Sequence, residues 1–158
     1  MKLLFICTHN RCRSILSESI TNSIADKKLI AASAGSAPQG DVHPLTIKYL
    51  SEKGFNTAGL NSKSWYEFEH YKPDVVLTMC DSAAKETCPV WFSDSLQVNW
   101  ALEDPSKNSA DNTKQKDAFF KTMDIIERRI QAVLDINTSQ LSDTELKQAF
   151  VDIAARIH

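Results

Sequence analysis

The segment from Cys7 to Ser14 carries the residue types best suited to chemistry in this sequence. It places a thiol and an arginine five residues apart, between an apolar run and a helical pattern. The backbone amides of such a loop can surround a tetrahedral anion at a helix N-terminus, where the helix dipole favours negative charge. The guanidinium of Arg13 can hold two oxygens of that anion. The pattern predicts a site for a phosphate-like oxyanion with Cys7 as its nucleophile, and the other binding residues are expected to be Thr8, His9, Asn10, Arg11, Cys12 and Ser14.

The same surroundings predict that Cys7 reacts as a thiolate. The thiolate is the nucleophilic form of cysteine, and both the helix N-terminus and the neighbouring guanidinium stabilise it. The loop contains no glycine. If the loop needs a positive φ, we expect Asn10 to adopt it, because asparagine tolerates that conformation. Cys12 lies in the same loop, and we expect it to serve packing. The alternative is that Cys7 only ends a buried strand and Arg13 is a surface charge.

The elements that would position this loop follow from the alternation of short apolar runs with helical patterns. This alternation predicts a parallel sheet with helices on both faces. The expected strands are 3–6, 29–34, 74–79 and 96–100, and the expected helices are 15–25, 44–53, 65–70 and 114–134. Cys7, Cys80 and Asp104 come after the first, third and fourth of these strands. Because ligands bind beyond the carboxyl ends of such strands, we expect the three side chains to share one site.

Composition limits the classes of function. The chain has 158 residues and a formal net charge of -2, which indicates one compact domain and no partner in nucleic acid or on a membrane surface. No segment is long enough to span a bilayer. The first apolar run ends at Ile6, so we expect no export signal and a cytoplasmic location. There, cysteines are more often thiols or redox-active groups than structural disulfides.

The spacing of the four cysteines and the charges beside them do not indicate a metal site. They fall into two pairs, separated by four and by seven residues, and arginines flank Cys12 on both sides. Both the spacing and the nearby positive charge argue against tetrahedral zinc. We therefore expect no metal and no cofactor.

Cys-x5-Arg-Ser after the first strand, with Asp104-Pro105 late in the chain, resembles the low-molecular-weight tyrosine phosphatase superfamily. The resemblance implies an α/β fold of three layers, α/β/α, with a four-stranded parallel sheet. It also implies that Asp104 protonates the leaving oxygen as a general acid. The tyrosine pair that usually follows Asp-Pro in the phosphatases is missing.

Within this superfamily, the sequence is most similar to the thioredoxin-coupled arsenate reductases. Three features carry the similarity: Cys7-Thr8 with Asn10 and Cys12, an apolar strand that ends in Cys80 with Cys88-Pro89 beyond it, and the stretch 99–106. The similarity covers roughly residues 1–134. Seven residues separate Cys80 from Cys88, one more than is usual in the family.

The resemblance implies a relay of three thiols. Cys7 would attack arsenate, Cys80 would attack Cys7 and release arsenite, and Cys88 would attack Cys80 and pass the disulfide to thioredoxin or glutaredoxin. We expect residues 81–87 to form a helical turn that unwinds to admit Cys88. The potassium site of some relatives is matched by Asn10, Glu18 and Ser33, but the carboxylate expected near Trp65 is missing. The missing carboxylate counts against bound potassium, and the sequence leaves open whether the ion binds.

Two other functions remain open at this point. One is a low-molecular-weight tyrosine phosphatase, and the other is a non-catalytic redox sensor on the same fold. The pair Cys80 and Cys88 favours the reductase over the phosphatase. A binding module would not need Cys7, Arg13 and Asp104 together.

The C-terminal segment is expected to extend the catalytic domain. We predict a phosphatase-like domain over 1–140 and an amphipathic helix of the same domain over 141–158. Ser142 and Glu145 form a capping-box pattern. An apolar stripe follows, and it includes Leu146, Ala149, Phe150, Ile153 and Ile157. We expect this stripe to pack on the chain's own helices, and the alternative is a partner protein or a second copy.

Overall fold

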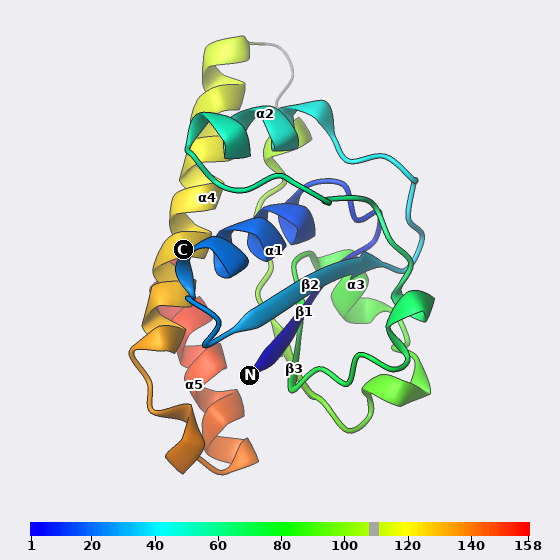
Figure 1. Cartoon of the computed structure of the whole chain (residues 1–158), viewed down its shortest axis with the longest axis vertical. Helices are drawn as coiled ribbons and strands as arrows, with labels where there is room; N and C mark the ends of the chain where they lie inside the picture. Colours follow the sequence, from blue (N-terminus) through cyan, green and yellow to red (C-terminus); the bar gives the residue numbers. More distant parts are fainter. Residues whose placement is uncertain (108–110) are drawn as a thin grey trace.

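The structure, a computed structural model, describes residues 1–107 and 111–158. In this part of the chain, four strands form one parallel sheet in the order β2-β1-β3-β4 (Figure 1). The strands are β1 (Lys2–Cys7), β2 (Ile30–Gly35), β3 (Val75–Thr78) and β4 (Leu96–Asn99). The two central strands are buried almost throughout, as a parallel sheet covered on both faces requires.

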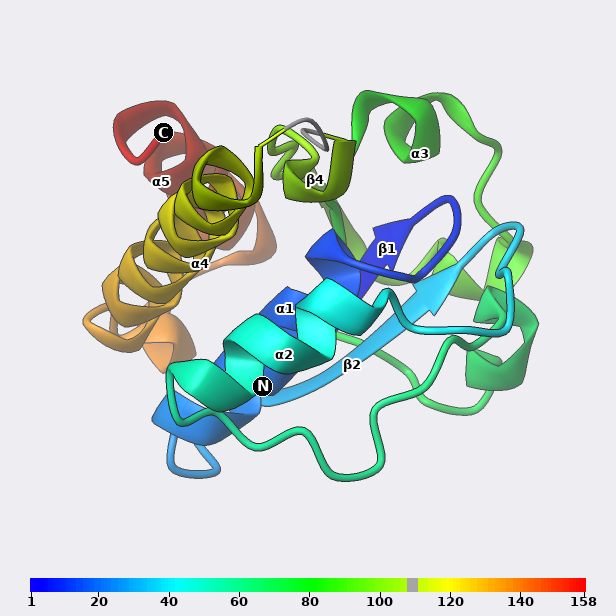
Figure 2. The same cartoon turned by 90° about the horizontal axis from the view of Figure 1, so that it is seen from above.

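Helices cover both faces of this sheet (Figure 2). The longer ones are α1 (Arg13–Ile24), α2 (Pro44–Glu52), α4 (Asn112–Leu134) and α5 (Asp143–Arg156). The short α3 (Asp81–Lys85) and the 3-10 turns Trp65–Phe68 and Val90–Phe92 lie across the sheet from α1, and Pro105–Lys107 and Thr138–Gln140 form further 3-10 turns. The predicted three-layer α/β/α architecture with an added C-terminal helix is confirmed.

The strand register brings the predicted functional residues to one edge. Ile6 lies opposite Thr78, and Thr78 lies opposite Asn99. The segments that follow β1, β3 and β4 therefore leave the sheet at the same level, and Cys7, Cys80 and Asp104 belong to these segments.

Local sequence signals account for several helix ends. His43 caps α2, because its Nδ1 accepts the Leu45 N–H at 3.2 Å and Pro44 occupies the first turn. α4 begins two residues before the predicted start, since Asp111 accepts hydrogen bonds from the first backbone amides of the helix. The capping box of Ser142 and Glu145 is present as predicted.

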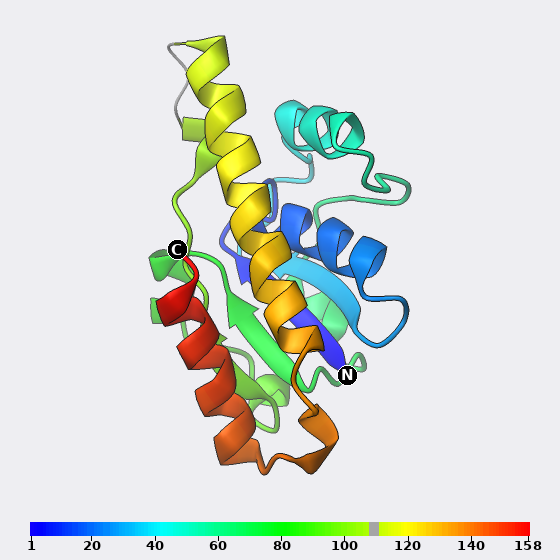
Figure 3. The same cartoon turned by 90° about the vertical axis from the view of Figure 1, so that its left-hand side faces the viewer.

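The C-terminal helix packs on the chain itself, against α4 and β4 (Figure 3). Phe150 and Ile153 are completely buried. The Trp100 indole donates to the Phe150 carbonyl at 2.9 Å, and Arg129 on α4 donates to the Ile157 carbonyl at 2.9 Å. Burial lowers the pKa of Arg129 to about 10. Phe150 and Ile153 of the apolar stripe thus lie against elements of the same chain. No helix in residues 1–107 and 111–158 has both the length and the apolar character needed to cross a membrane.

Phe150→Ala is expected to lower the free energy of unfolding by about 3–5 kcal/mol, because it removes a buried aromatic ring and leaves a cavity. Val151→Ala, at an exposed position on the same helix, is the matched control and should change the free energy of unfolding by less than about 0.5 kcal/mol. Denaturant unfolding measures both. Equal effects of the two substitutions would contradict the proposal that residues 141–158 belong to the same domain as 1–140.

Candidate active site

The loop from Cys7 to the start of α1 is held from behind by Asn10. Asn10 has φ 47°, so the residue predicted to take the left-handed conformation does so. Its side chain is buried and donates to the Ser14 hydroxyl at 2.8 Å and to the Ser33 hydroxyl at 2.9 Å. It also accepts the Lys63 backbone N–H at 2.7 Å. Asn10 thereby fixes the loop to α1, β2 and the segment before the first 3-10 turn.

Gly35, at the end of β2, allows this loop to lie close to the sheet. A Cβ added there would meet the Thr8 carbonyl oxygen at 2.7 Å and the Asn10 nitrogen at 3.0 Å. Any other residue would push the loop away. The sequence contains no signal for this contact, because a glycine that ends a strand is common.

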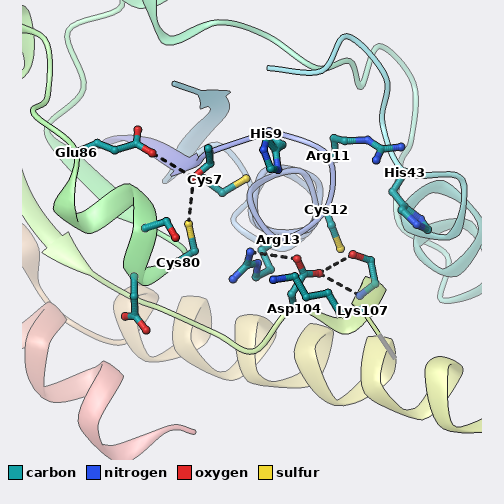
Figure 4. Close-up of a pocket in the computed structure, with 14 residues that line it drawn as sticks. Cys7, His9, Arg11, Cys12, Arg13, His43, Cys80, Glu86, Asp104 and Lys107 are labelled. Atoms are coloured by element: carbon teal, nitrogen blue, oxygen red, sulfur yellow. Dashed lines mark hydrogen bonds and ion pairs between the residues drawn. The ribbon is translucent and has the colours of Figure 1, made fainter. Parts of the chain in front are cut away.

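The loop forms one side of a pocket of about 430 Å³ (Figure 4). The pocket brings together most of the predicted site residues, and those that line it are Cys7, Thr8, His9, Arg11, Cys12, Arg13, Cys80 and Asp104. Asn10 and Ser14 do not line it, because their side chains are buried behind the loop. Cys88 also lies outside its lining. Six further residues that were not predicted line it as well: His43, Asp81, Ser82, Glu86, Ser106 and Lys107.

Ser14 lies directly beside the predicted nucleophile. The Cys7 sulfur and the Ser14 oxygen are 2.9 Å apart. Because Asn10 already donates to the Ser14 oxygen, the hydroxyl hydrogen of Ser14 is free to point at the sulfur. This arrangement orients Cys7 and places a donor where a thiolate needs one.

Cys12 has different surroundings. It is buried, and burial raises the pKa of its thiol to about 12, although a hydrogen bond with Thr46 acts in the opposite direction. Cys12 therefore stays a neutral thiol at physiological pH. A neutral thiol at this position fits the packing role that the sequence predicts for Cys12.

Arg13 and Asp104 form an ion pair across the pocket. The guanidinium approaches the carboxylate to 3.2 Å and also donates to the Leu102 carbonyl at 2.9 Å. Its Nε is buried and has no hydrogen-bond partner in the part of the chain that the structure describes. Burial acts to raise the pKa of Asp104, but hydrogen bonds from Ser106 and the charge of Arg13 outweigh it, so this pKa lies below its ordinary value. Asp104 is a carboxylate in this arrangement.

Cys80 supplies a second thiol to the same pocket. It is buried at the end of β3, and its sulfur accepts the Ala83 N–H at 3.3 Å. The Thr8 hydroxyl lies 3.9 Å from this sulfur, so Cys80 faces the nucleophile loop directly.

Comparison with known families agrees with this geometry. A family model described as low molecular weight phosphotyrosine protein phosphatase matches residues 2–148. The chain belongs to this phosphatase family. It is 30% identical over 108 residues to a glutaredoxin arsenate reductase of Synechocystis sp., covering 68% of this chain and 81% of the relative. It is also 30% identical over 129 residues to an arsenate reductase of Halalkalibacterium halodurans, covering 82% and 91%.

Solved structures show the same fold. An arsenate reductase in the phosphate-binding state superposes with a TM-score of 0.70 at 26% identity, covering 84% of this chain and 95% of that one. A thioredoxin-dependent arsenate reductase of Corynebacterium glutamicum superposes with a TM-score of 0.66 at 28% identity, covering 88% and 63%. The predicted membership of the phosphatase superfamily is confirmed.

In this member of the phosphatase family, Cys88 follows Cys80 in the chain after α3 and two further residues, and it does not line the pocket. The predicted helical turn over 81–87 is present as α3, although it ends at Lys85. Cys88 is half-buried, and burial together with the negative charge of Glu86 raises the pKa of its thiol. Cys88 is therefore held as a neutral thiol, and it does not line the pocket that Cys7 lines.

The residues of the implied potassium site do not fit the ion. Glu18 accepts a hydrogen bond from Ser33, and the Lys63 ammonium lies 3.2 Å from the same Glu18 oxygen. A positive charge of the protein thus already occupies the position beside this carboxylate. The described ranges 1–107 and 111–158 also contain no cluster of three or more His, Cys, Asp or Glu side chains able to hold a metal.

His43 is the clearest pocket residue that the sequence did not indicate. It caps α2 and also lines the pocket, and burial, followed by the charge of Arg11, lowers the pKa of its imidazole. Ser106 and Lys107 reach the pocket because the turn after Pro105 folds back over Asp104. The sequence spacing of Ser106 and Lys107 from the other site residues does not predict that they line the pocket.

Proposed function

We propose that this enzyme reduces arsenate to arsenite by a cysteine relay and is regenerated by thioredoxin or a similar thiol reductant. One observation carries the proposal: Cys7, Arg13 and Cys80 line the same pocket. Hydrolysis of a phosphate ester needs one thiol nucleophile, whereas two-electron reduction of an oxyanion needs a second thiol, because the two sulfurs together give up one electron pair and end as a disulfide. The similarity to several proteins named arsenate reductase supports the same choice. Such an activity would serve arsenic detoxification.

In the first step, the Cys7 thiolate attacks arsenic and one arsenate oxygen leaves as water. The backbone of the loop and Arg13 hold the remaining oxygens. The buried Nε of Arg13, which has no partner within residues 1–107 and 111–158, is a donor that the oxyanion would satisfy. Preorganised donors of this kind stabilise the charge that develops in the transition state.

Asp104 would supply the proton to the departing oxygen. Its pKa is held low by Ser106 and Arg13. An oxyanion in the loop would engage Arg13 and place negative charge beside Asp104, and both effects raise the pKa of a carboxyl group. Binding of substrate would thereby convert Asp104 into a proton donor.

In the second step, the Cys80 thiolate attacks the Cys7 sulfur. The sulfur–sulfur bond forms, the electron pair of the sulfur–arsenic bond moves to arsenic, and arsenite leaves. Cys88 then attacks Cys80 and frees Cys7, and a dithiol reductant reduces the Cys80–Cys88 disulfide. Since Cys88 lies outside the pocket lining, this last exchange requires α3 to open.

The proposal is tested by arsenite production from arsenate with thioredoxin and its reductase, with glutaredoxin and glutathione in parallel, and by p-nitrophenyl phosphate hydrolysis beside both. We expect sustained arsenite production with one of the two reductants and slow ester hydrolysis. Fast ester hydrolysis without arsenite in either arm would instead identify a phosphatase.

Asp104→Asn is expected to slow the first chemical step by about 10²–10⁴-fold, because it removes the proton donor. Arsenate affinity should change little. Single-turnover quench experiments measure the step, and competition by phosphate measures binding. Glu103→Gln, an exposed neighbour, is the matched control and should react at the wild-type rate. A collapse of affinity with an unchanged chemical step would show that Asp104 organises the loop instead.

A further inference from the structure

Glu86 places a carboxylate in the wall of an anion-binding pocket. It lies between Cys80 and Cys88 in the chain, and its side chain turns back toward the nucleophile loop (Figure 4). Its Oε1 accepts a hydrogen bond from the Thr8 hydroxyl at 3.2 Å. Its Oε2 is buried and has no partner among residues 1–107 and 111–158. A negative charge at this position opposes substrate binding, so its role must lie in another step.

The Thr8 hydroxyl connects Glu86 to the second thiol. Thr8 Oγ1 lies 3.9 Å from the Cys80 sulfur and 3.2 Å from the Glu86 carboxylate. A hydroxyl that accepts from a thiol and donates to a carboxylate can pass a proton from one to the other. The sulfur contact is long, as hydrogen bonds used in catalysis often are before substrate binds.

The other carboxylates of the pocket do not offer this path. Asp104 is bound to Arg13 and Ser106. Asp81 is exposed, and no hydrogen bond joins it to Thr8 in the described part of the chain. Glu86 is thus the carboxylate connected to the Cys80 thiol.

We propose that Glu86 accepts the proton of Cys80, through the Thr8 hydroxyl, when Cys80 attacks Cys7. The inference rests on the proposed cysteine relay. The Cys80 S–H bond breaks, Thr8 takes this proton and gives its own to Glu86, and the thiolate forms the bond to the Cys7 sulfur. The electron pair of the sulfur–arsenic bond leaves with arsenic, which becomes arsenite. The Ala83 N–H, which already binds the Cys80 sulfur, stabilises the thiolate while it forms.

This transfer would also prepare the next step. The charge of Glu86 is one of the two causes that oppose ionisation of Cys88, the other being burial. Once Glu86 holds the proton of Cys80, that charge is gone. The same event that forms the Cys7–Cys80 disulfide therefore favours the thiolate that must attack it.

The test uses Glu86→Gln in the full chain with Cys88→Ser added, so that the reaction stops at the Cys7–Cys80 disulfide. Arsenate is added without reductant, and quenched samples are analysed by mass spectrometry between pH 6 and pH 9.5. We expect disulfide formation to slow by about 10²-fold at neutral pH. The rates of disulfide formation with Glu86 in place and with Glu86→Gln should become equal as the pH rises past about 8.5, because a thiol then ionises without a base. Alkylation of Cys7 by iodoacetamide should not slow in Glu86→Gln, which separates a defect in Cys80 from a defect in the nucleophile.

Among the described residues, the ionisable groups that line the pocket with Glu86 are Cys7, His9, Arg11, Cys12, Arg13, His43, Cys80, Asp81, Asp104 and Lys107. Cys88 lies outside the lining, but the charge of Glu86 raises its pKa. Glu69→Gln, an exposed site with the same chemical change, is the control and should leave the pH profile unchanged. Thr8→Val should slow the same step, and combining it with Glu86→Gln should add little, because both substitutions break one path.

Two results would overturn the inference in different ways. If the parent chain forms the disulfide and Glu86→Gln forms it equally fast, or is slowed equally at every pH, Glu86 is not the proton acceptor. If the parent chain forms no Cys7–Cys80 disulfide with arsenate, the relay itself is wrong and the role of Glu86 fails with it.

Discussion

Cys7→Ser is expected to reduce arsenate turnover to background, a loss of about 10⁴-fold or more, as the removal of a catalytic nucleophile does in other enzymes. A serine oxygen at this position cannot form the sulfur–sulfur bond on which reduction depends. It would keep the contact with Ser14 and the fold of the loop. The loss of activity would therefore come from the missing sulfur and not from a change in structure. Arsenite production over many turnovers measures it.

Cys12→Ser is the matched control, since it makes the same atomic change in the same loop. Cys12 is a buried thiol with a pKa of about 12, so it contributes no thiolate. We expect activity within about tenfold of wild type, with some loss of stability from placing a hydroxyl in a buried site. Similar residual activity in the two variants would overturn the assignment of Cys7.

Cys88→Ser is expected to allow one turnover and then stop. Without a third thiol, the Cys7–Cys80 disulfide persists inside the pocket, where Cys80 is only 6% exposed and a protein reductant has little access. With thioredoxin as the only reductant, about one equivalent of arsenite per enzyme should appear, followed by a rate near background. Mass spectrometry of the stalled protein should locate the disulfide between Cys7 and Cys80.

The wild-type chain, treated with arsenate and no reductant, provides the control. It should accumulate a Cys80–Cys88 disulfide instead, because Cys88 can complete the relay. The opening this requires falls on α3, a helix of five residues in which Ala83 is the buried side chain, so little packing opposes its unwinding. Continued turnover by Cys88→Ser with thioredoxin alone would count decisively against the relay.

The sequence by itself determined the elements and the loop. Runs such as 3–6 and 75–77 are apolar without alternation, which is typical of strands buried on both faces. The bounds of the observed strands differ from the predicted ones by at most one residue at either end. Asn10 was the residue of a glycine-free loop best able to take a positive φ, and it has one. These features depend on neighbours in the chain, which is why a single sequence displays them.

Contacts between distant segments were decided by the tertiary structure. Arg13 and Asp104 are 91 residues apart, and their distance depends on how β3, β4 and their crossovers place two loops. Lys63 meets Glu18, and Glu86 meets Thr8, across 45 and 78 residues. No periodicity or motif encodes such pairs, because each requires the packing of helices on the sheet before the side chains come within reach. The thiol, its loop and Asp104 could thus be predicted from the chain alone, whereas the contacts of Glu86 with Thr8 and of Lys63 with Glu18 emerged only in the folded chain.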